Sequence, residues 1–202
     1  MTQTIELLDL LMTEIQDCRI CEDHLQPNPV LRLSTSARLL VIGQAPGTRV
    51  HATGIPWNDP SGVRLRSWLG MDDEVFYDTS KVAIMPMGYC YPGKGKSGDL
   101  PPRRECREAW HDRALQLMPE IKTTLLIGQY AQNAYLPTPG KSLSDNVRNW
   151  KQWFPHLIPL PHPSPRNTLW LKQRPWFEDE VVPAVREFVH ELLHPGSSRD
   201  IP

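Results

Sequence analysis

The sequence lacks any long apolar run, internal repeat or low-complexity segment. A membrane-spanning helix needs about 20 consecutive apolar residues, and no stretch of this chain approaches that length. The N-terminal residues are acidic and amphipathic, rather than basic and then apolar as in a secretory signal. These absences exclude a spanning helix and lead us to expect a cytoplasmic protein that does not bind membranes.

The chain also lacks a large net charge of either sign. The formal net charge is −1 at pH 7, whereas domains that bind nucleic acids are more often basic overall. Basic residues nevertheless gather in the stretches 94–107 and 148–174. A solvated surface is the ordinary role of any one of these side chains, so charge alone does not identify a nucleic-acid partner.

What the sequence has in abundance is proline, with 21 residues, and tryptophan, with seven. Together they indicate long, ordered loops on a compact scaffold. A chain of 202 residues can bury the core of one domain, which we expect over residues 1–194, followed by a loose tail at 195–202. Nothing in the sequence indicates an obligate oligomer, and we expect a monomer.

Short apolar runs alternate with amphipathic segments along the chain. Strands are expected at 38–42, 82–87, 123–127 and 156–160. Helices are expected at 4–17, 61–69, 103–117, 129–135, 143–153 and 175–193, the last kinked or divided at Pro183. This alternation is typical of an α/β fold, with a mostly parallel sheet between two layers of helices. The segment 88–102, between the strand expected at 82–87 and the helix expected at 103–117, is rich in Gly, Pro and Lys and is too long for an ordinary connector.

The two most informative motifs each follow an apolar run. One is Gly43-Gln44-Ala45-Pro46-Gly47, after the run 39–42; the other is His162-Pro163-Ser164-Pro165, after the run 157–161. In an open α/β sheet, the loops that leave the carboxyl ends of parallel strands converge on one crevice, where ligands bind. We therefore expect the two motifs to form two walls of one site.

The four cysteines form a pattern of two pairs. Cys18 and Cys21 are a C-x2-C pair, while Cys90 and Cys106 flank the long loop. Disulfides are disfavoured in a cytoplasmic protein, so metal binding is the better interpretation. Four thiolates suit either tetrahedral zinc or an iron–sulfur cluster, and unrelated core cysteines are the remaining alternative.

In this order and spacing, the motifs resemble those of the uracil-DNA glycosylase superfamily, most closely its iron–sulfur branch. The resemblance covers roughly residues 15–190. It rests on the segment 43–47, the segment Gly54-Ile55-Pro56-Trp57 with Gly62 and Leu65 downstream, the segment 162–165, and the four cysteines. It implies an α/β/α sandwich around a four-stranded parallel sheet, and a structural [4Fe–4S] cluster held by Cys18, Cys21, Cys90 and Cys106.

The resemblance also implies roles for single residues in excising a base that has been rotated out of DNA. His162 would donate a hydrogen bond to the leaving base, and Trp57 would stack on that base. A structural histidine and a core tryptophan are the alternatives. Ala45 and Pro46 would border the base. The residues expected to contact DNA are Gly47, Ser164, Arg166, Asn167 and Leu169, with Leu169 or its neighbour Trp170 as an apolar wedge.

The sequence departs from the family pattern at two positions. Gln44 stands where the family has an acid; it can position a water but cannot offset the charge of a cationic sugar. Asp59 is the nearest acid that could replace it, although a turn residue before Pro60 is the alternative. The family's base-reading Asn aligns with Pro86, and Asn58 could supply the missing amide.

The leading hypothesis is a DNA glycosylase that hydrolyses the N-glycosidic bond of a deaminated base, uracil first, in base-excision repair. One alternative is a weakly active or non-catalytic protein that binds damaged DNA on the same scaffold. Another is an enzyme of nucleotide metabolism, which the lack of overall positive charge leaves open.

Overall fold

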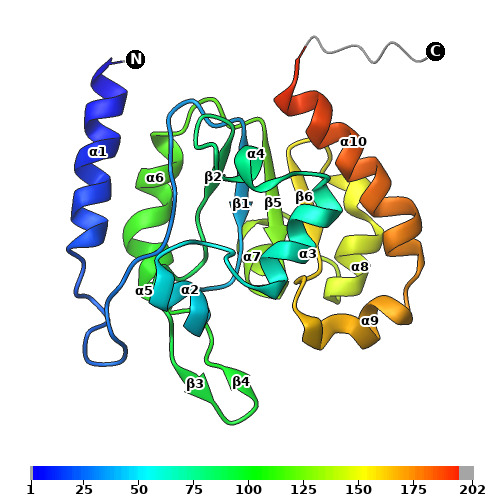
Figure 1. The fold of residues 1–202 in the computed structure, drawn as a ribbon, viewed down its shortest axis with the longest axis horizontal. Helices are drawn as coiled ribbons and strands as arrows, with labels where there is room; N and C mark the ends of the chain where they lie inside the picture. Colours follow the sequence, from blue (N-terminus) through cyan, green and yellow to red (C-terminus); the bar gives the residue numbers. More distant parts are fainter. Residues whose placement is uncertain (1, 196–202) are drawn as a thin grey trace.

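The central feature of the fold is one sheet of four parallel strands, seen here in a computed structural model that describes residues 2–195. The strands are β1 (Leu39–Ile42), β2 (Val82–Ile84), β5 (Thr123–Ile127) and β6 (Leu157–Leu160). They lie in the order β2-β1-β5-β6 and every pairing is parallel. The predicted α/β fold with a four-stranded parallel sheet is confirmed (Figure 1).

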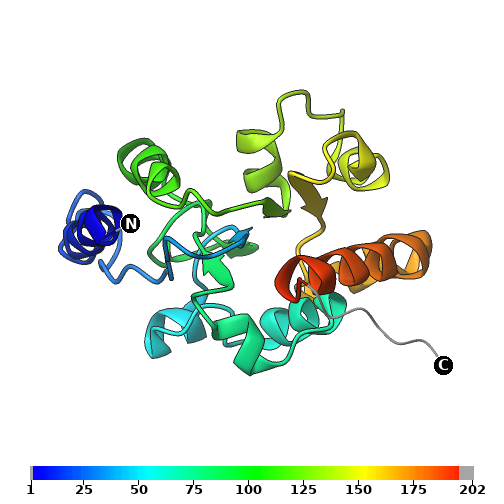
Figure 2. The ribbon, with the colours of Figure 1, turned by 90° about the horizontal axis from the view of Figure 1, so that it is seen from above.

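Each face of the sheet carries its own hydrophobic core, because successive side chains of a strand point to opposite faces. Leu39 and Val41 of β1 belong to one core, which includes helices α3 (Pro60–Leu69) and α10 (Val182–Leu193). Leu40 and Ile42 belong to the other, which includes helices α1 (Thr2–Gln16), α6 (Asp112–Gln116) and α7 (Gln129–Tyr135). Burial on both faces explains why the strands read as continuous apolar runs, and Figure 2 shows helices on both sides of the sheet.

The predicted helices are present with adjusted limits. They are α1 (Thr2–Gln16), α3 (Pro60–Leu69), α7 (Gln129–Tyr135), α8 (Leu143–Arg148) and α10 (Val182–Leu193). The helix predicted at 103–117 consists of α5 (Arg104–Cys106), a π-helical turn (Arg107–His111) and α6 (Asp112–Gln116). Pro183 lies just after a π-helical turn (Phe177–Val181) that is continuous with α10, because Val181 and Val182 both have helical backbone angles; its missing N–H falls at this irregular turn, where the regular helical hydrogen bonding is already interrupted.

Several short elements have no counterpart among the sequence predictions. They are α2 (Thr48–Thr53), α4 (Asp73–Tyr77), α9 (Thr168–Lys172) and the antiparallel strands β3 (Lys94–Gly95) and β4 (Gly98–Asp99). The two strands turn the long loop 88–102 into a hairpin in which Lys94 pairs with Asp99. In Figure 1 this hairpin extends from the lower end of the molecule, near α2.

The C-terminal tail predicted at 195–202 lies outside the described residues from position 196 onward. Within residues 2–195, none of the helices combines the length and apolarity needed to cross a bilayer. The second predicted strand, 82–87, is regular only as far as Ile84. Beyond it, the amides of Met85 and Met87 still donate to the carbonyl oxygens of Val41 and Gly43, at 3.0 and 2.9 Å. Pro86 takes the alternate position, whose N–H would point away from β1, so its missing donor does not interrupt this pairing.

Candidate functional site

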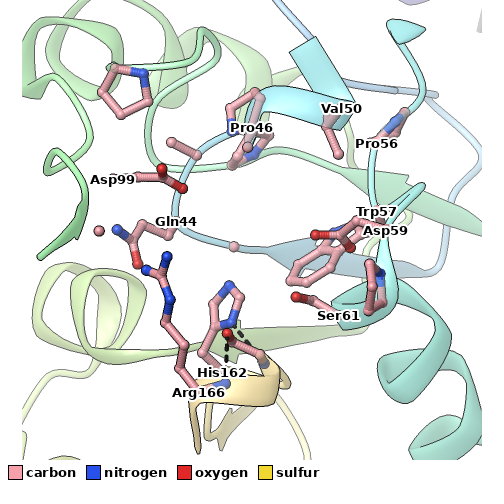
Figure 3. A pocket seen from close by; sticks show the side chains of 18 of the residues that line it. Gln44, Pro46, Val50, Pro56, Trp57, Asp59, Ser61, Asp99, His162 and Arg166 are labelled. Carbon is pink, nitrogen blue, oxygen red and sulfur yellow. Dashed lines mark hydrogen bonds between the residues drawn. The ribbon is translucent and has the colours of Figure 1, made fainter. Parts of the chain in front are cut away.

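A cavity of about 470 Å³ opens at the carboxyl ends of the parallel strands. Both strand-end motifs line the cavity. The segment between α2 and α3 lines it too, and so does the β3–β4 hairpin. The lining residues whose side chains are labelled in Figure 3 include Gln44, Pro46, Trp57, Asp59, Ser61, Asp99, His162 and Arg166. Segments far apart in the sequence thus form one enclosure, at the place expected for a ligand site in this fold.

The first motif is held to the chain after β2 by its own backbone. Amide groups of Met87 and Gly88 donate to the carbonyl oxygens of Gly43 and Gln44, at 2.9 and 3.0 Å. A Cβ atom at position 43 would lie 2.7 Å from Cζ2 of Trp57. Glycine is therefore needed where β1 ends, because the indole occupies the space a side chain would take.

Trp57 forms an aromatic wall of the cavity in a strained backbone conformation. Its φ of 59° is in the left-handed region that non-glycine residues rarely adopt. Its carbonyl oxygen accepts a hydrogen bond from Arg66 at 3.2 Å, and a Cβ at Gly62 would overlap that same carbonyl. The indole also packs on the sheet core, so Trp57 is at once a core residue and a cavity wall.

Asp59 and Asn58 follow Trp57 and point in different directions. Asp59 begins α3: its carboxylate accepts the N–H of Gly62 at 2.8 Å, and it also lines the cavity. The amide of Asn58 instead donates to the hydroxyl of Thr53 at 3.5 Å, and Asn58 is absent from the described cavity lining.

His162 faces Trp57 across the cavity, with 5.6 Å between the ring centroids and 33° between the ring planes. The amide N–H of Ser164 donates to Nδ1 of His162 at 3.2 Å. Because Nδ1 accepts a hydrogen bond, the neutral ring carries its proton on Nε2. Burial lowers the pKa of His162, although the negative charge of Asp59 opposes the shift. The result is a neutral imidazole with a hydrogen-bond donor available at the cavity.

The loop after His162 is fixed by hydrogen bonds from two directions. Arg64 of α3 donates to the carbonyl oxygens of Pro163 and Ser164, at 3.3 and 3.2 Å. The side chain of Asn167 donates to the carbonyl oxygen of His162 at 2.8 Å. These contacts join the loop to the element that carries the other cavity wall, so the spacing between the two walls is set by the scaffold.

The remaining residues predicted to contact DNA divide into two groups. Those lining the cavity are Gly47, Ser164, Arg166 and Asn167, together with the predicted base neighbours Ala45 and Pro46. Leu169 lies on α9, outside the cavity lining, with 65% of its surface exposed. A leucine so exposed, one helical turn from the cavity rim, has the apolar character expected of a wedge.

Sequence reasoning missed the residues that the hairpin and α3 bring to the cavity. Ser61, in the first turn of α3, is buried and lines it. Residues 97–100 of the hairpin also line it, among them Asp99, whose carboxylate accepts the hydroxyl of Tyr91 at 3.3 Å. The only signal for the hairpin was the excessive length of its loop.

The four cysteines lie apart from the cavity and all have free thiols. The pKa of Cys106 is raised to about 12, chiefly by burial and in smaller part by negative charge on Cys90, Cys21 and Cys18. The four thiols, from three separate segments, are thus within electrostatic reach of one another, a donor set whose mutual repulsion a metal would relieve. Within residues 2–195, no three His, Cys, Asp or Glu side chains form a group that could hold a metal ion.

A comparison with protein-family models identifies the relationship that the geometry suggests. The model described as the uracil DNA glycosylase superfamily matches residues 32–186. This match covers more than half of the chain and includes both strand-end motifs, Trp57 and the hairpin. The chain therefore belongs to the uracil-DNA glycosylase superfamily.

Proposed function

We propose that this protein is a DNA glycosylase that removes a deaminated base, uracil first, by hydrolysing the N-glycosidic bond in base-excision repair. The observation that carries the proposal is the pairing of His162 with Trp57 across one cavity. An aromatic face and a neutral donor, 5.6 Å apart between ring centroids, are the two groups that an extruded base requires.

The reaction would use these two groups in sequence. The base leaves the helix at a cost of a few kcal/mol and stacks on Trp57. As the bond between C1′ and the base breaks, its electron pair moves to the base, and Nε2–H of His162 donates to the base carbonyl oxygen. A donor aimed at the charge that develops during the reaction lowers the barrier more than one that binds the ground state.

The attacking water needs a partner on the sugar side of the cavity. Gln44 lines the cavity, and its amide can orient a water there but adds no charge. Asp59 is also near, and its negative charge partly opposes the lowering of the His162 pKa by burial. One of its oxygens is engaged at the start of α3, so its contribution to the sugar is mainly electrostatic.

DNA would be held by the loop after His162. Ser164, Arg166 and Asn167 lie at the cavity rim, where they can contact phosphates that flank the extruded nucleotide. Leu169 would enter the duplex and fill the vacated space. Gly47 and Ala45 permit the sugar to approach the backbone closely, and the exposed Lys94 of the hairpin adds positive charge near the cavity.

The cysteines support a [4Fe–4S] cluster like that of the iron–sulfur branch, with zinc as the alternative. Four thiols from three segments suit a cluster, which separates its ligands more widely than one tetrahedral ion does. Cys18 and Cys21 follow α1, Cys90 follows β2, and Cys106 ends α5. When bound, the cluster would supply structural cross-linking, and these residues would tie α1 to the edge of the sheet.

A second candidate is a protein that binds damaged DNA with little or no cleavage. Gln44 favours it, because the amide cannot balance positive charge on the sugar. The two candidates make opposite predictions for strand cleavage, and one substrate panel separates them.

The test is a set of labelled oligonucleotides containing uracil, hypoxanthine or xanthine, single-stranded and in duplex, incubated with the purified protein and then treated with hot alkali. The glycosylase proposal expects cleavage at the modified base, with uracil the best substrate. No cleavage at any base, together with tight binding to damaged DNA that His162→Ala abolishes, would establish the binding protein instead.

A further inference from the structure

The cavity contains an acid that comes from outside both family motifs. Gln44 provides no negative charge, yet a sugar that becomes cationic during bond cleavage is stabilised by negative charge nearby. Asp99, at the end of the β3–β4 hairpin, lines the same cavity as Gln44 and His162. In Figure 3 its carboxylate lies on the same side of the cavity as Gln44.

The position of Asp99 is defined by contacts on both sides of the hairpin. Its Oδ1 accepts the hydroxyl of Tyr91 at 3.3 Å, and the amide of Leu100 closes the hairpin on the carbonyl of Gly93 at 2.8 Å. Its Oδ2 lies 4.0 Å from the point where a Cβ of Gly47 would be. A side chain at position 47 would therefore touch this carboxylate, and glycine leaves the space between the first motif and Asp99 open.

The hairpin is also in contact with the loop that carries His162. Gly98 has a φ of 146°, which only glycine adopts readily, and a Cβ there would collide with the guanidinium of Arg166. The close approach seats the hairpin against the second motif. Asp99 is thereby held at the edge of a cavity whose other edges are the two family motifs.

Asp99 and Asp59 each accept one hydrogen bond on Oδ1, and they differ in where they are held: Asp59 begins α3, whereas Asp99 lies on the hairpin, on the same side of the cavity as Gln44. Asp59 accepts the N–H of Gly62 and is committed to the first turn of α3. Asp99 makes no ion pair with any residue in the described part of the chain, and only its Oδ1 accepts a hydrogen bond there. Its Oδ2 remains open to a ligand.

We propose that Asp99 is the catalytic carboxylate of this glycosylase and compensates for Gln44. This inference rests on the proposed function. As the bond between C1′ and the base breaks, its electron pair leaves with the base, and Asp99 stabilises the positive sugar. Water, oriented by the Gln44 amide, forms the new bond from its oxygen to C1′ and gives one proton to Asp99. The base leaves as its anion and takes up a proton from solvent, while Asp99 returns its proton to solvent, so that the products are the free base and an abasic site.

The test is single-turnover excision by Asp99→Asn, Asp99→Glu and the wild type, on the best substrate of the panel. The matched control is Glu187→Gln, which removes one exposed acid of α10 far along the chain. Binding to a duplex carrying 2′-fluoro-deoxyuridine, whose fluorine resists formation of a cationic sugar, is measured in parallel.

We expect Asp99→Asn to excise at least about a hundredfold more slowly, within the range of a lost general base, while its Kd for the fluorinated duplex stays unchanged. Asp99→Glu should recover part of the rate, and Glu187→Gln should match the wild type. An Asp99→Asn rate within about threefold of the wild type would overturn the role of Asp99 and leave the proposed function standing. A wild type that excises nothing would overturn both.

Discussion

The amide N–H of Ser164 donates to Nδ1 of His162 at 3.2 Å, and this one hydrogen bond determines which ring nitrogen can act on a substrate. It leaves the proton on Nε2 and makes the neutral ring, not the imidazolium, the form that fits the loop. In a protonated ring, Nδ1 would carry a proton that points at the N–H of Ser164, and the two donors would repel each other. Burial, which lowers the pKa of His162, acts in the same direction.

The pH dependence of excision follows from this arrangement. Since the pKa of His162 is lowered, the neutral ring persists as the pH falls from about 8 through about 6.5, the usual value for histidine. The single-turnover rate should stay level over that interval as far as His162 is concerned, and decline only at lower pH. A rate that climbs as the pH falls through 6.5 would instead identify the imidazolium as the donor.

Trp57 should contribute to binding through its aromatic face. Trp57→Phe keeps an aromatic ring, whereas Trp57→Ala removes the stacking surface, which is worth about 1–3 kcal/mol per base. We therefore expect Trp57→Ala to weaken binding to the fluorinated duplex by roughly tenfold or more, and Trp57→Phe to weaken it much less. Equal losses in both variants would mean that binding requires the indole itself, which also packs on the sheet core, and not an aromatic face in general.

Leu169 should matter for duplex DNA and not for single strands. Its exposed side chain can fill the space left by an extruded base, which exists only in a stacked duplex. Leu169→Ala is expected to slow excision from duplex uracil DNA by about tenfold, roughly the loss of 1.4 kcal/mol, and to leave the single-stranded rate near that of the wild type. The same loss on both substrates would assign Leu169 to folding or to general DNA contact.

The cysteines should hold iron and sulfide. Protein purified without oxygen is expected to be brown and to contain four irons per chain. Cys106→Ser should lower both the iron content and the thermal midpoint, because a structural cluster stabilises only the folded state that binds it. Stoichiometric zinc in place of iron would reject the cluster, and full iron content in Cys106→Ser would remove that residue from the ligand set.

The parts of the fold that sequence alone could predict are those with a repeated physical signal. The runs 39–42, 123–127 and 157–160 are mostly apolar, with Thr123 and Thr124 as the exceptions, because both faces of the sheet are covered. Parallel strand ends converge, so the meeting of the two motifs also followed from the pattern. Pro183 was harder to interpret, since a proline suits both a kink and a first helical turn.

The rest of the site depends on contacts between distant segments. The hairpin 94–99 has no hydrophobic period, and its approach to the cavity requires Gly98 beside Arg166. The side chain of Asn58 donates to Thr53 and is absent from the described cavity lining, and the residue before it, Trp57, has a positive φ that no sequence pattern indicates at a tryptophan. Asp99 is therefore visible as a candidate only in three dimensions.

The most direct test of the account is the single-turnover excision rate of His162→Ala on duplex DNA with one uracil, compared with the wild type. Loss of the Nε2–H donor should lower the rate by roughly a hundred- to a thousandfold, as for other donors to a developing anion, while binding to the fluorinated duplex is largely retained. A His162→Ala rate close to that of the wild type would contradict the central claim that His162 drives departure of the base.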